Sequence, residues 1–373
     1  MSKIIIGSDV VPYGKVESLF SDGNLRAILG ESLSKIWLGA EYRFFNLECP
    51  VTNSNKGINK NGPLLKCNPK TINGIKKLEP TCVMLANNHI MDYSVVGLED
   101  TIKLLDGSGI DWIGVGKDAK NLKKTFSFRC DNKEITIYNC CEHEFSIATD
   151  TNPGANPYNE LDIFDEIRES KKNSDYLVIV YHGGKEYYRY PSPLLQKRCR
   201  KMIDSGVDLV ICQHSHCVGC EEKYKKGIIV YGQGNYIFNK RSNEFWDTSL
   251  LISIDVKNGF KTDYIPIVRT EDGTSLASEA QAKVILGSFS ERSSEIKNQG
   301  FVEKKYREFA EERLDNYLMI LSRHNRLLKL IHRISPKAFR AIKYKYAAIL
   351  NVVECEAHNE LLIEGLRGKL KKK

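Results

Sequence analysis

The chain lacks any run of about 18 apolar residues, the length a helix needs to cross a bilayer, so we expect no membrane-spanning segment. Its first residues, MSKIIIG, hold too short an apolar run for a signal peptide and lack a small-residue cleavage site. Because eleven cysteines is an odd number and no secretion signal is visible, no disulfide framework is expected. These absences predict a cytoplasmic protein with reduced thiols.

Acidic residues are missing from one long segment near the C-terminus. Residues 316–353 contain eight Lys or Arg and no Asp or Glu. Residues 301–373 hold 17 basic and 9 acidic side chains, so they account for the whole net charge of +8. Apolar residues recur at helical spacing over 326–334 with basic residues between them, which predicts a basic amphipathic helix. Its apolar face either packs on the rest of the protein or lies against anionic lipid or polymer at the inner face of the membrane. Nucleic acid is disfavoured because no binding motif accompanies the charge.

Strand-like and helix-like segments alternate through the first 270 residues, which predicts an α/β domain. Apolar runs predict strands over 3–8, 42–47, 81–86, 111–115, 135–139, 176–181 and 208–212. Helical spacing of apolar residues predicts helices over 71–78, 98–105 and 194–203. Further strands over 228–231, 250–254 and 264–268 have little helix between them, so part of the fold is expected to be antiparallel. Strand signals stop near Glu271, and we predict domains over 1–270 and 271–373, the latter a basic helical extension.

Side chains of metal-ligand type follow five of the predicted strands. Since ligands of open α/β sheets bind beyond the strand ends, these side chains are expected to converge. They are Asp9, Glu48, Asn88, His182 and the pair His214 and His216. Taken singly, each is more often a cap, loop or structural residue, but their coincidence at successive strand ends predicts one metal site.

The residue types in this set indicate which metal ions could bind. Carboxylate, amide and imidazole ligands without thiolate suit divalent Mn, Fe, Zn or Mg. One carboxylate shared by two ions about 3.5–4 Å apart is the usual arrangement of two-metal hydrolases, in which a bridging water becomes the nucleophile. The sequence therefore predicts two divalent ions, with a nearby histidine protonating the leaving group.

Cys217 and Cys220 form a CxxC directly after His216. Such a pair could bind zinc, but no second pair accompanies it. A redox role would require the first cysteine at a helix N-terminus. Unpaired thiols beside the metal site are the third interpretation.

Six motifs in order resemble the CapA family of poly-γ-glutamate capsule synthesis proteins, relatives of the calcineurin-like metallophosphoesterases. The resemblance covers roughly residues 4–270 and implies a four-layer α-β-β-α sandwich. The motifs are Gly7-Ser8-Asp9-Val10, Asn46-Leu47-Glu48, Ala86-Asn87-Asn88-His89 with Asp92, His182-Gly183-Gly184-Lys185-Glu186-Tyr187, Gln213-His214-Ser215-His216 and Tyr231-Gly232-Gln233-Gly234-Asn235-Tyr236-Ile237-Phe238.

The resemblance also implies roles for individual residues. Asp9 and His216 are similar to the ligands of one metal. The ligands of the other metal resemble Asn88, His182 and His214. Glu48 resembles the carboxylate that bridges the two ions. His89 resembles the residue that contacts the substrate oxyanion or protonates the leaving group, and Glu186 is similar to a glutamate that faces the same cleft.

Three positions depart from the wider pattern. Metallophosphoesterases generally begin Asp-x-His, whereas this chain has Val11 at the histidine position, a loss that the CapA family shares and for which Glu186 is a candidate replacement. Gln213 stands where a Gly is usual, and Gly183 where a Trp is usual. A weakened first metal site or a single-metal enzyme is therefore an open alternative.

Three functions are consistent with these features. The first is a metal-dependent hydrolase or transferase of capsule, exopolysaccharide or poly-γ-glutamate biosynthesis, acting on a phosphoester or a γ-glutamyl-type amide. The second is a non-catalytic subunit that binds the anionic polymer or organises capsule synthase components. The third is a membrane-surface adaptor that works through residues 316–353.

Overall fold

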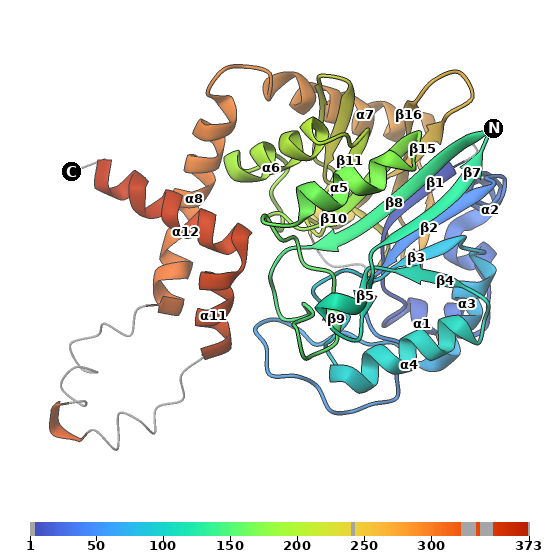
Figure 1. Cartoon of the computed structure of the whole chain (residues 1–373), viewed down its shortest axis with the longest axis horizontal. Coiled ribbons are helices and arrows are strands. Elements are labelled where there is room, and N and C mark those ends of the chain that lie inside the picture. Colours follow the sequence, from blue (N-terminus) through green and yellow to red (C-terminus); the bar gives the residue numbers. More distant parts are fainter. Residues whose placement is uncertain (1–3, 240–242, 322–332, 336–345, 372–373) are drawn as a thin grey trace.

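The computed structural model describes residues 4–239, 243–321, 333–335 and 346–371 (Figure 1). Within these residues, two large β-sheets lie face to face and carry helices on their outer surfaces. No helix in the described ranges combines the length and the apolar character needed to cross a bilayer.

The first sheet runs in the order β17-β16-β15-β1-β2-β3-β4, with β14 also paired to β1. Its parallel part consists of β1 (Ile4–Val10), β2 (Tyr42–Leu47), β3 (Cys82–Met84), β4 (Asp111–Ile113) and β14 (Asn235–Ile237). Its antiparallel part consists of β15 (Thr248–Asp255), β16 (Lys261–Arg269) and β17 (Thr274–Leu276).

The second sheet runs in the order β12-β13-β11-β10-β8-β7. Four strands are parallel, namely β8 (Lys133–Cys141), β10 (Tyr176–His182), β11 (Leu209–Gln213) and β13 (Gly227–Tyr231). The edges are antiparallel, formed by β7 (Thr125–Cys130) and β12 (Glu221–Tyr224). A small third sheet joins β5 (Val115–Gly116), β6 (Leu122–Lys123) and β9 (Gly154–Ala155).

Apolar side chains form three layers, which lie between the four successive layers of the α-β-β-α arrangement. The inner layer joins the facing sides of both sheets, where residues such as Phe44 and Val180 are fully buried. Alternate residues of the same strands, such as Phe45 and Ile179, point to the outer layers, as the period of a strand requires. The helices over the first sheet are α1 (Val16–Ser21), α2 (Leu25–Leu38), α3 (Ile72–Lys77) and α4 (Ser94–Asp106), and those over the second are α5 (Ile163–Lys172) and α6 (Pro193–Asp204). Short 3-10 turns lie at Pro69–Thr71, Ala119–Asn121 and Glu244–Trp246. The four-layer sandwich is therefore confirmed.

The C-terminal part of the chain is helical, and α8, α11 and α12 lie together at one end of the molecule (Figure 1). Before them, α7 (Glu279–Glu295) packs on the rim of the sandwich through Ile285 and Phe289. The helices are α8 (Phe301–Leu321), α11 (Tyr346–Glu354) and α12 (Glu356–Lys371). Their contact with the sandwich includes an apolar cluster of Tyr188, Tyr306, Ala310, Tyr317, Val352 and Leu361. The predicted basic helix over 326–334 lies outside the described residues except for 333–334.

One sequence expectation needs correction. Strands do not stop near Glu271, because β17 pairs with β16 up to Leu276. The expected antiparallel part is present, since β15 pairs with β16 and β13 pairs with β12 in this way, although β13 also runs parallel to β11. Helices α1 and α2 were not expected from the apolar spacing. The division at residue 270 stays a prediction about independent folding, although β17 and α7 pack on the sandwich.

Candidate metal centre

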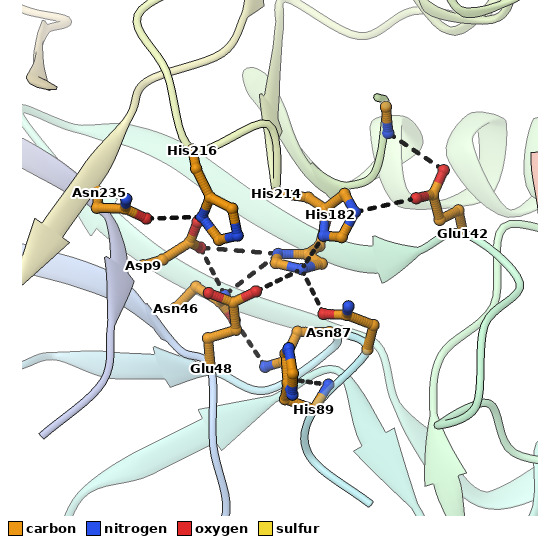
Figure 2. A network of polar contacts seen from close by, with 12 residues as sticks. Asp9, Asn46, Glu48, Asn87, His89, Glu142, His182, His214, His216 and Asn235 are labelled. Carbon is orange, nitrogen blue, oxygen red and sulfur yellow. Dashed lines mark hydrogen bonds and ion pairs between the residues drawn. The ribbon is translucent and has the colours of Figure 1, made fainter. Parts of the chain in front are cut away.

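The parallel strands of both sheets deliver polar residues to one place (Figure 2). In the first sheet, Asp9 on β1 lies beside Asn46 on β2 and Asn235 on β14. In the second sheet, His182 ends β10 and lies beside Gln213, the residue before His214. The facing sheets therefore bring carboxylates from one and imidazoles from the other into a common site.

The predicted ligands form two groups that share Glu48. Ligand atoms of Asp9, Glu48 and His216 lie within 4.8 Å of one another, and so do those of Glu48, His182 and His214. In the second group, Nε2 of His182 lies 3.2 Å from Oε1 of Glu48 and 3.2 Å from Nδ1 of His214. Oδ1 of Asn88 is 3.1 Å from the same Nε2. All six predicted ligands are thus brought together.

The carboxylates of this site are buried without adequate protein partners. Among the described residues, Oδ2 of Asp9 and both oxygens of Glu48 accept no well-aligned hydrogen bond. Burial, followed by the charge of Glu48, raises the pKa of Asp9 to about 6. Burial also opposes ionisation of Glu48, but the imidazoles around it, His182 foremost, lower its pKa to about 2. Buried carboxylates without partners are costly unless a cation compensates them, so this donor set fits divalent metal ions.

The imidazoles are oriented by contacts on their far side. Nδ1 of His216 lies 2.9 Å from Oδ1 of Asn235, which leaves Nε2 as the ligand atom. Nε2 of His214 lies 3.5 Å from Oε1 of Glu142, which leaves Nδ1 facing His182. Burial, with the charge of His182, lowers the pKa of His214 to about 3 and keeps it neutral, as a ligand must be.

The loop that carries the histidine pair has an unusual backbone. His214 and His216 both have positive φ, 76° and 54°, in the left-handed region that side chains other than glycine rarely adopt. Strain of this kind persists where the surrounding structure imposes it, and it is common at functional sites. Here it lets alternate residues of one short loop turn both rings into the site.

His89 lies beside the ligands and is held from its outer side. Nδ1 of His89 is 2.6 Å from Oδ2 of Asp92. Lys60 pairs with the other oxygen of Asp92 and lies 3.1 Å from the same ring nitrogen. Because a carboxylate only accepts hydrogen bonds, the short contact to Asp92 places a proton on Nδ1 and leaves Nε2 of His89 for chemistry.

Glu186 lies close enough to the histidine pair for their charges to affect it. Burial opposes its ionisation, but the charges of His216 and His214 hold its pKa below the usual value. The next residue, Tyr187, donates its backbone N–H to the carbonyl of Ser215 at 2.9 Å, which joins the two loops. Val11, at the position where metallophosphoesterases have histidine, is a fully buried apolar residue.

Two carboxylates at the site, Glu142 and Glu144, were missed by the sequence reasoning. Glu142 approaches His214, and burial raises its pKa well above the usual value. The pKa of Glu144 is lowered, although burial opposes this, by a hydrogen bond from His358, by the charges of His214 and His358, and by a hydrogen bond from the Asn88 side chain. Both directly follow β8, so the strand-end rule that found Asp9 could have found them.

The CxxC has no sign of metal or redox chemistry. All eleven cysteines lie within the described residues and are free and buried. Burial raises the pKa of Cys217 to about 11, the opposite of what a reactive thiol needs. A Cβ on Gly219 would lie 1.6 Å from the carbonyl oxygen of Tyr231, so close backbone packing explains the glycine between the cysteines.

Fold and site together define a class. Two sheets between helical layers, with carboxylate, amide and imidazole groups gathered at the parallel strand ends, make this a metallophosphatase-like α/β protein.

Comparison with known families gives the particular assignment. Residues 3–240 match the family model described as bacterial capsule synthesis protein PGA_cap, and the chain belongs to this family. It is 30% identical over 193 residues to the capsule biosynthesis protein CapA of Bacillus anthracis, covering 50% of this chain and 47% of that protein. It is 29% identical over 229 residues to the PGA biosynthesis protein CapA of Bacillus subtilis, covering 60% of each. The chain thus spans about half the length of the curated relatives it matches.

Solved structures with related folds are more distant. A phosphatase from Mycoplasma pneumoniae aligns with a TM-score of 0.45 and 13% identity, covering 72% of this chain and 95% of that one. A 5'-nucleotidase from Candida albicans aligns with a TM-score of 0.43 and 11% identity, covering 83% and 57%. TM-scores below 0.5 support no inference about the activity of this chain.

Proposed function

We propose that this chain is a metal-dependent hydrolase or transferase of poly-γ-glutamate capsule formation, acting on a phosphoester or a γ-glutamyl-type amide. The observation that carries the proposal is the position of Glu48, buried without well-aligned partners and common to both ligand groups. Capsule formation comes from the family and from the names of the two CapA relatives. An anionic polymer or phosphoester is accordingly the proposed substrate, and capsule synthase components are the proposed partners.

In this proposal the six ligands divide between two divalent ions. Asp9 and His216 would hold one ion, Asn88, His182 and His214 would hold the other, and Glu48 would contribute to both. Bound ions of this kind would supply Lewis acidity and an activated water. Glu186 stands near His216 and His214, where it can add a carboxylate to the site that lacks the usual imidazole.

The protein residues around the ions bind and move protons. Asn46 donates to Oδ1 of Asp9 at 2.7 Å, which leaves Oδ2 of this carboxylate available to hold an ion. His89 is held at Nδ1 by Asp92, and in its doubly protonated imidazolium form it can donate the Nε2 proton to the leaving group. Lys60 adds a positive charge beside His89, which suits an anionic substrate.

The test is to remove one central ligand and measure both metal and turnover. His182→Ala should strongly reduce bound metal, determined by elemental analysis, and abolish hydrolysis of phosphoester and γ-glutamyl substrates, because Nε2 of His182 meets three other ligand atoms. Cys212→Ala is a matched control, since this buried side chain on β11 packs in the outer apolar layer. Full metal occupancy in His182→Ala would refute the ligand assignment, and bound metal without turnover in the wild type would favour the non-catalytic polymer-binding alternative.

A further inference from the structure

The residues between the metal centre and the C-terminal helices form a continuous polar chain. Glu144, just beyond β8, is approached on one side by the side chain of Asn88, which hydrogen-bonds to it. On the other side, Nε2 of His358 on α12 lies 3.7 Å from Oε1 of Glu144. One carboxylate therefore lies between a proposed metal ligand and a residue more than 200 positions further along the chain.

The far side of the His358 ring determines where its proton lies. Nζ of Lys185 is 3.3 Å from Nδ1 of His358, and the hydroxyl of Tyr317 on α8 is 2.6 Å from the same atom. An ammonium group can only donate, so Nδ1 acts as the acceptor and the ring proton is on Nε2, facing Glu144. Burial, with the charge of Lys185, lowers the pKa of His358, so the ring is neutral.

Glu144 in turn determines which end of the Asn88 amide faces the metal centre. Because a carboxylate accepts but cannot donate, the amide NH2 of Asn88 must face Glu144. The amide oxygen then faces the centre, where Oδ1 lies 3.1 Å from Nε2 of His182. Reversal of this amide would present two N–H donors to a cation.

A separate metal ion at this second cluster is disfavoured. Ligand atoms of Glu144, Cys355 and His358 do lie within 4.8 Å of one another. However, the Lys185 ammonium occupies the other side of the His358 ring, and the proton on Nε2 blocks the nitrogen that would have to coordinate. Burial also raises the pKa of the Cys355 thiol well above the usual value, which disfavours thiolate formation.

We propose that His358 of the C-terminal extension is a positioning residue for the metal centre, because it holds Glu144 in the orientation that directs Oδ1 of Asn88 to the ion. The proposal rests on the proposed function in that Asn88 must be a ligand. Outer contacts that orient metal ligands typically contribute 10–100-fold in metal affinity. The C-terminal helices thus complete the site as well as covering one end of the sandwich.

The test measures Mn²⁺ binding to metal-free, full-length protein. His358→Leu should raise the Kd of one of two Mn²⁺ ions by roughly 10–100-fold and leave the other nearly unchanged, since only one group contains Asn88. His358→Gln, which keeps an N–H donor near the position of Nε2, should recover most of the affinity. The melting temperature of the metal-free protein identifies any general loss of folding.

Two further variants distinguish positioning from docking of the helix. Glu360→Gln changes another contact of α12, the one to Ser192 and to the backbone N–H of Leu194, and should not alter Mn²⁺ affinity. Glu144→Ala should produce the same loss as His358→Leu, and the double variant should lose no more than either single one, because both act through one contact. Glu144→Ala also tests the proposal if His358→Leu does not fold.

The outcomes separate this proposal from the proposed function. Wild-type Mn²⁺ affinity in both His358→Leu and Glu144→Ala would overturn the positioning role alone. Equal losses in His358→Leu and Glu360→Gln would also overturn it, because they would show a docking effect. If the wild-type protein binds none of Mn²⁺, Fe²⁺, Zn²⁺ and Mg²⁺, both proposals fail.

Discussion

Among single residues, His89 has the surroundings that most restrict its chemistry. Asp92 and Lys60 take up its Nδ1 side, so only Nε2 can meet a substrate. Among the described residues, the hydrogen bonds of this ring go to Asp92 and Lys60, and neither is a proposed metal ligand. His89 is therefore expected to act on the substrate while the ligands hold the metal.

His89→Asn should keep the bound metal and lower kcat by roughly 10²–10⁴-fold, because a general acid is removed while the ligand set is intact. Elemental analysis and steady-state kinetics measure the two effects separately. A substrate whose leaving group needs no proton should be much less affected by the change. Unchanged turnover with a leaving group that needs a proton would remove His89 from the mechanism.

Residues that support the ligands were harder to find in the sequence than the ligands. Asp9 and His182 stand out because each is a metal-ligand type directly after an apolar run. Asn235 and Glu142 orient ligands through single contacts across strands or between loops. Such a contact depends on strand register and loop path, which the residue pattern does not specify.

At the scale of elements, the last helix is attached by partly buried ion pairs. One of these pairs joins Nδ1 of His143 to Oε1 of Glu356, at the start of α12, over 2.6 Å. The backbone N–H of His143 donates to the other oxygen of Glu356 at 2.9 Å. The hydrogen bond to Glu356 raises the pKa of His143, and the bonds from His143 lower the pKa of Glu356 although burial opposes this.

This pair predicts a pH dependence of stability. A raised folded-state pKa means that the His143 contribution is fully present below its unfolded value near 6.5 and is lost as pH rises through the folded-state value. The contribution is on the order of 1 kcal/mol or less, because solvent screens a partly exposed pair. The difference in unfolding free energy between wild type and His143→Gln, measured by urea denaturation, should therefore be larger at pH 6 than at pH 9. A difference that stays constant or grows with pH would contradict the pairing, and His143→Gln leaves the neighbouring Glu142 and Glu144 in place.

At the scale of the whole molecule, the C-terminal helices have two candidate roles. Every proposed ligand precedes Val218, so the sequence by itself leads one to expect a tail without influence on the metal. The contacts of His358 and Lys185 lead to the opposite expectation. The lipid or polymer contact predicted for residues 316–353 concerns a segment of which the structure describes only parts.

Removal of residues 346–373 should lower both metal content and thermal stability. The truncated chain lacks His358 and also exposes apolar side chains that α11 and α12 cover, among them Tyr306 and Tyr188. Elemental analysis and a thermal melt test the two effects, with Glu360→Gln in the full chain as the matched control. Unchanged metal content in a folded truncated protein would show that the extension does not contribute to the site.

Binding to phosphatidylglycerol vesicles tests the surface role separately. Charge attraction is screened beyond about 8 Å in physiological salt, so binding through the basic segment should fall steeply between low and high salt. Full-length protein that shows no salt-sensitive binding would leave the extension as a structural part of the protein.

Sequence alone was sufficient for the α/β class and for a set of candidate ligands that the fold brings together. Buried parallel strands need continuous apolar runs, and the functional groups of such a sheet must follow those runs, so the alternation and the strand-end residues can both be read in order. The tertiary structure was needed for β17, for the parallel pairing of β13, and for the link from His358 through Glu144 to Asn88. These depend on which segments pack side by side, and residues 144 and 358 meet only because the last helix folds back onto the sandwich. Local sequence patterns do not indicate contacts between residues so far apart along the chain.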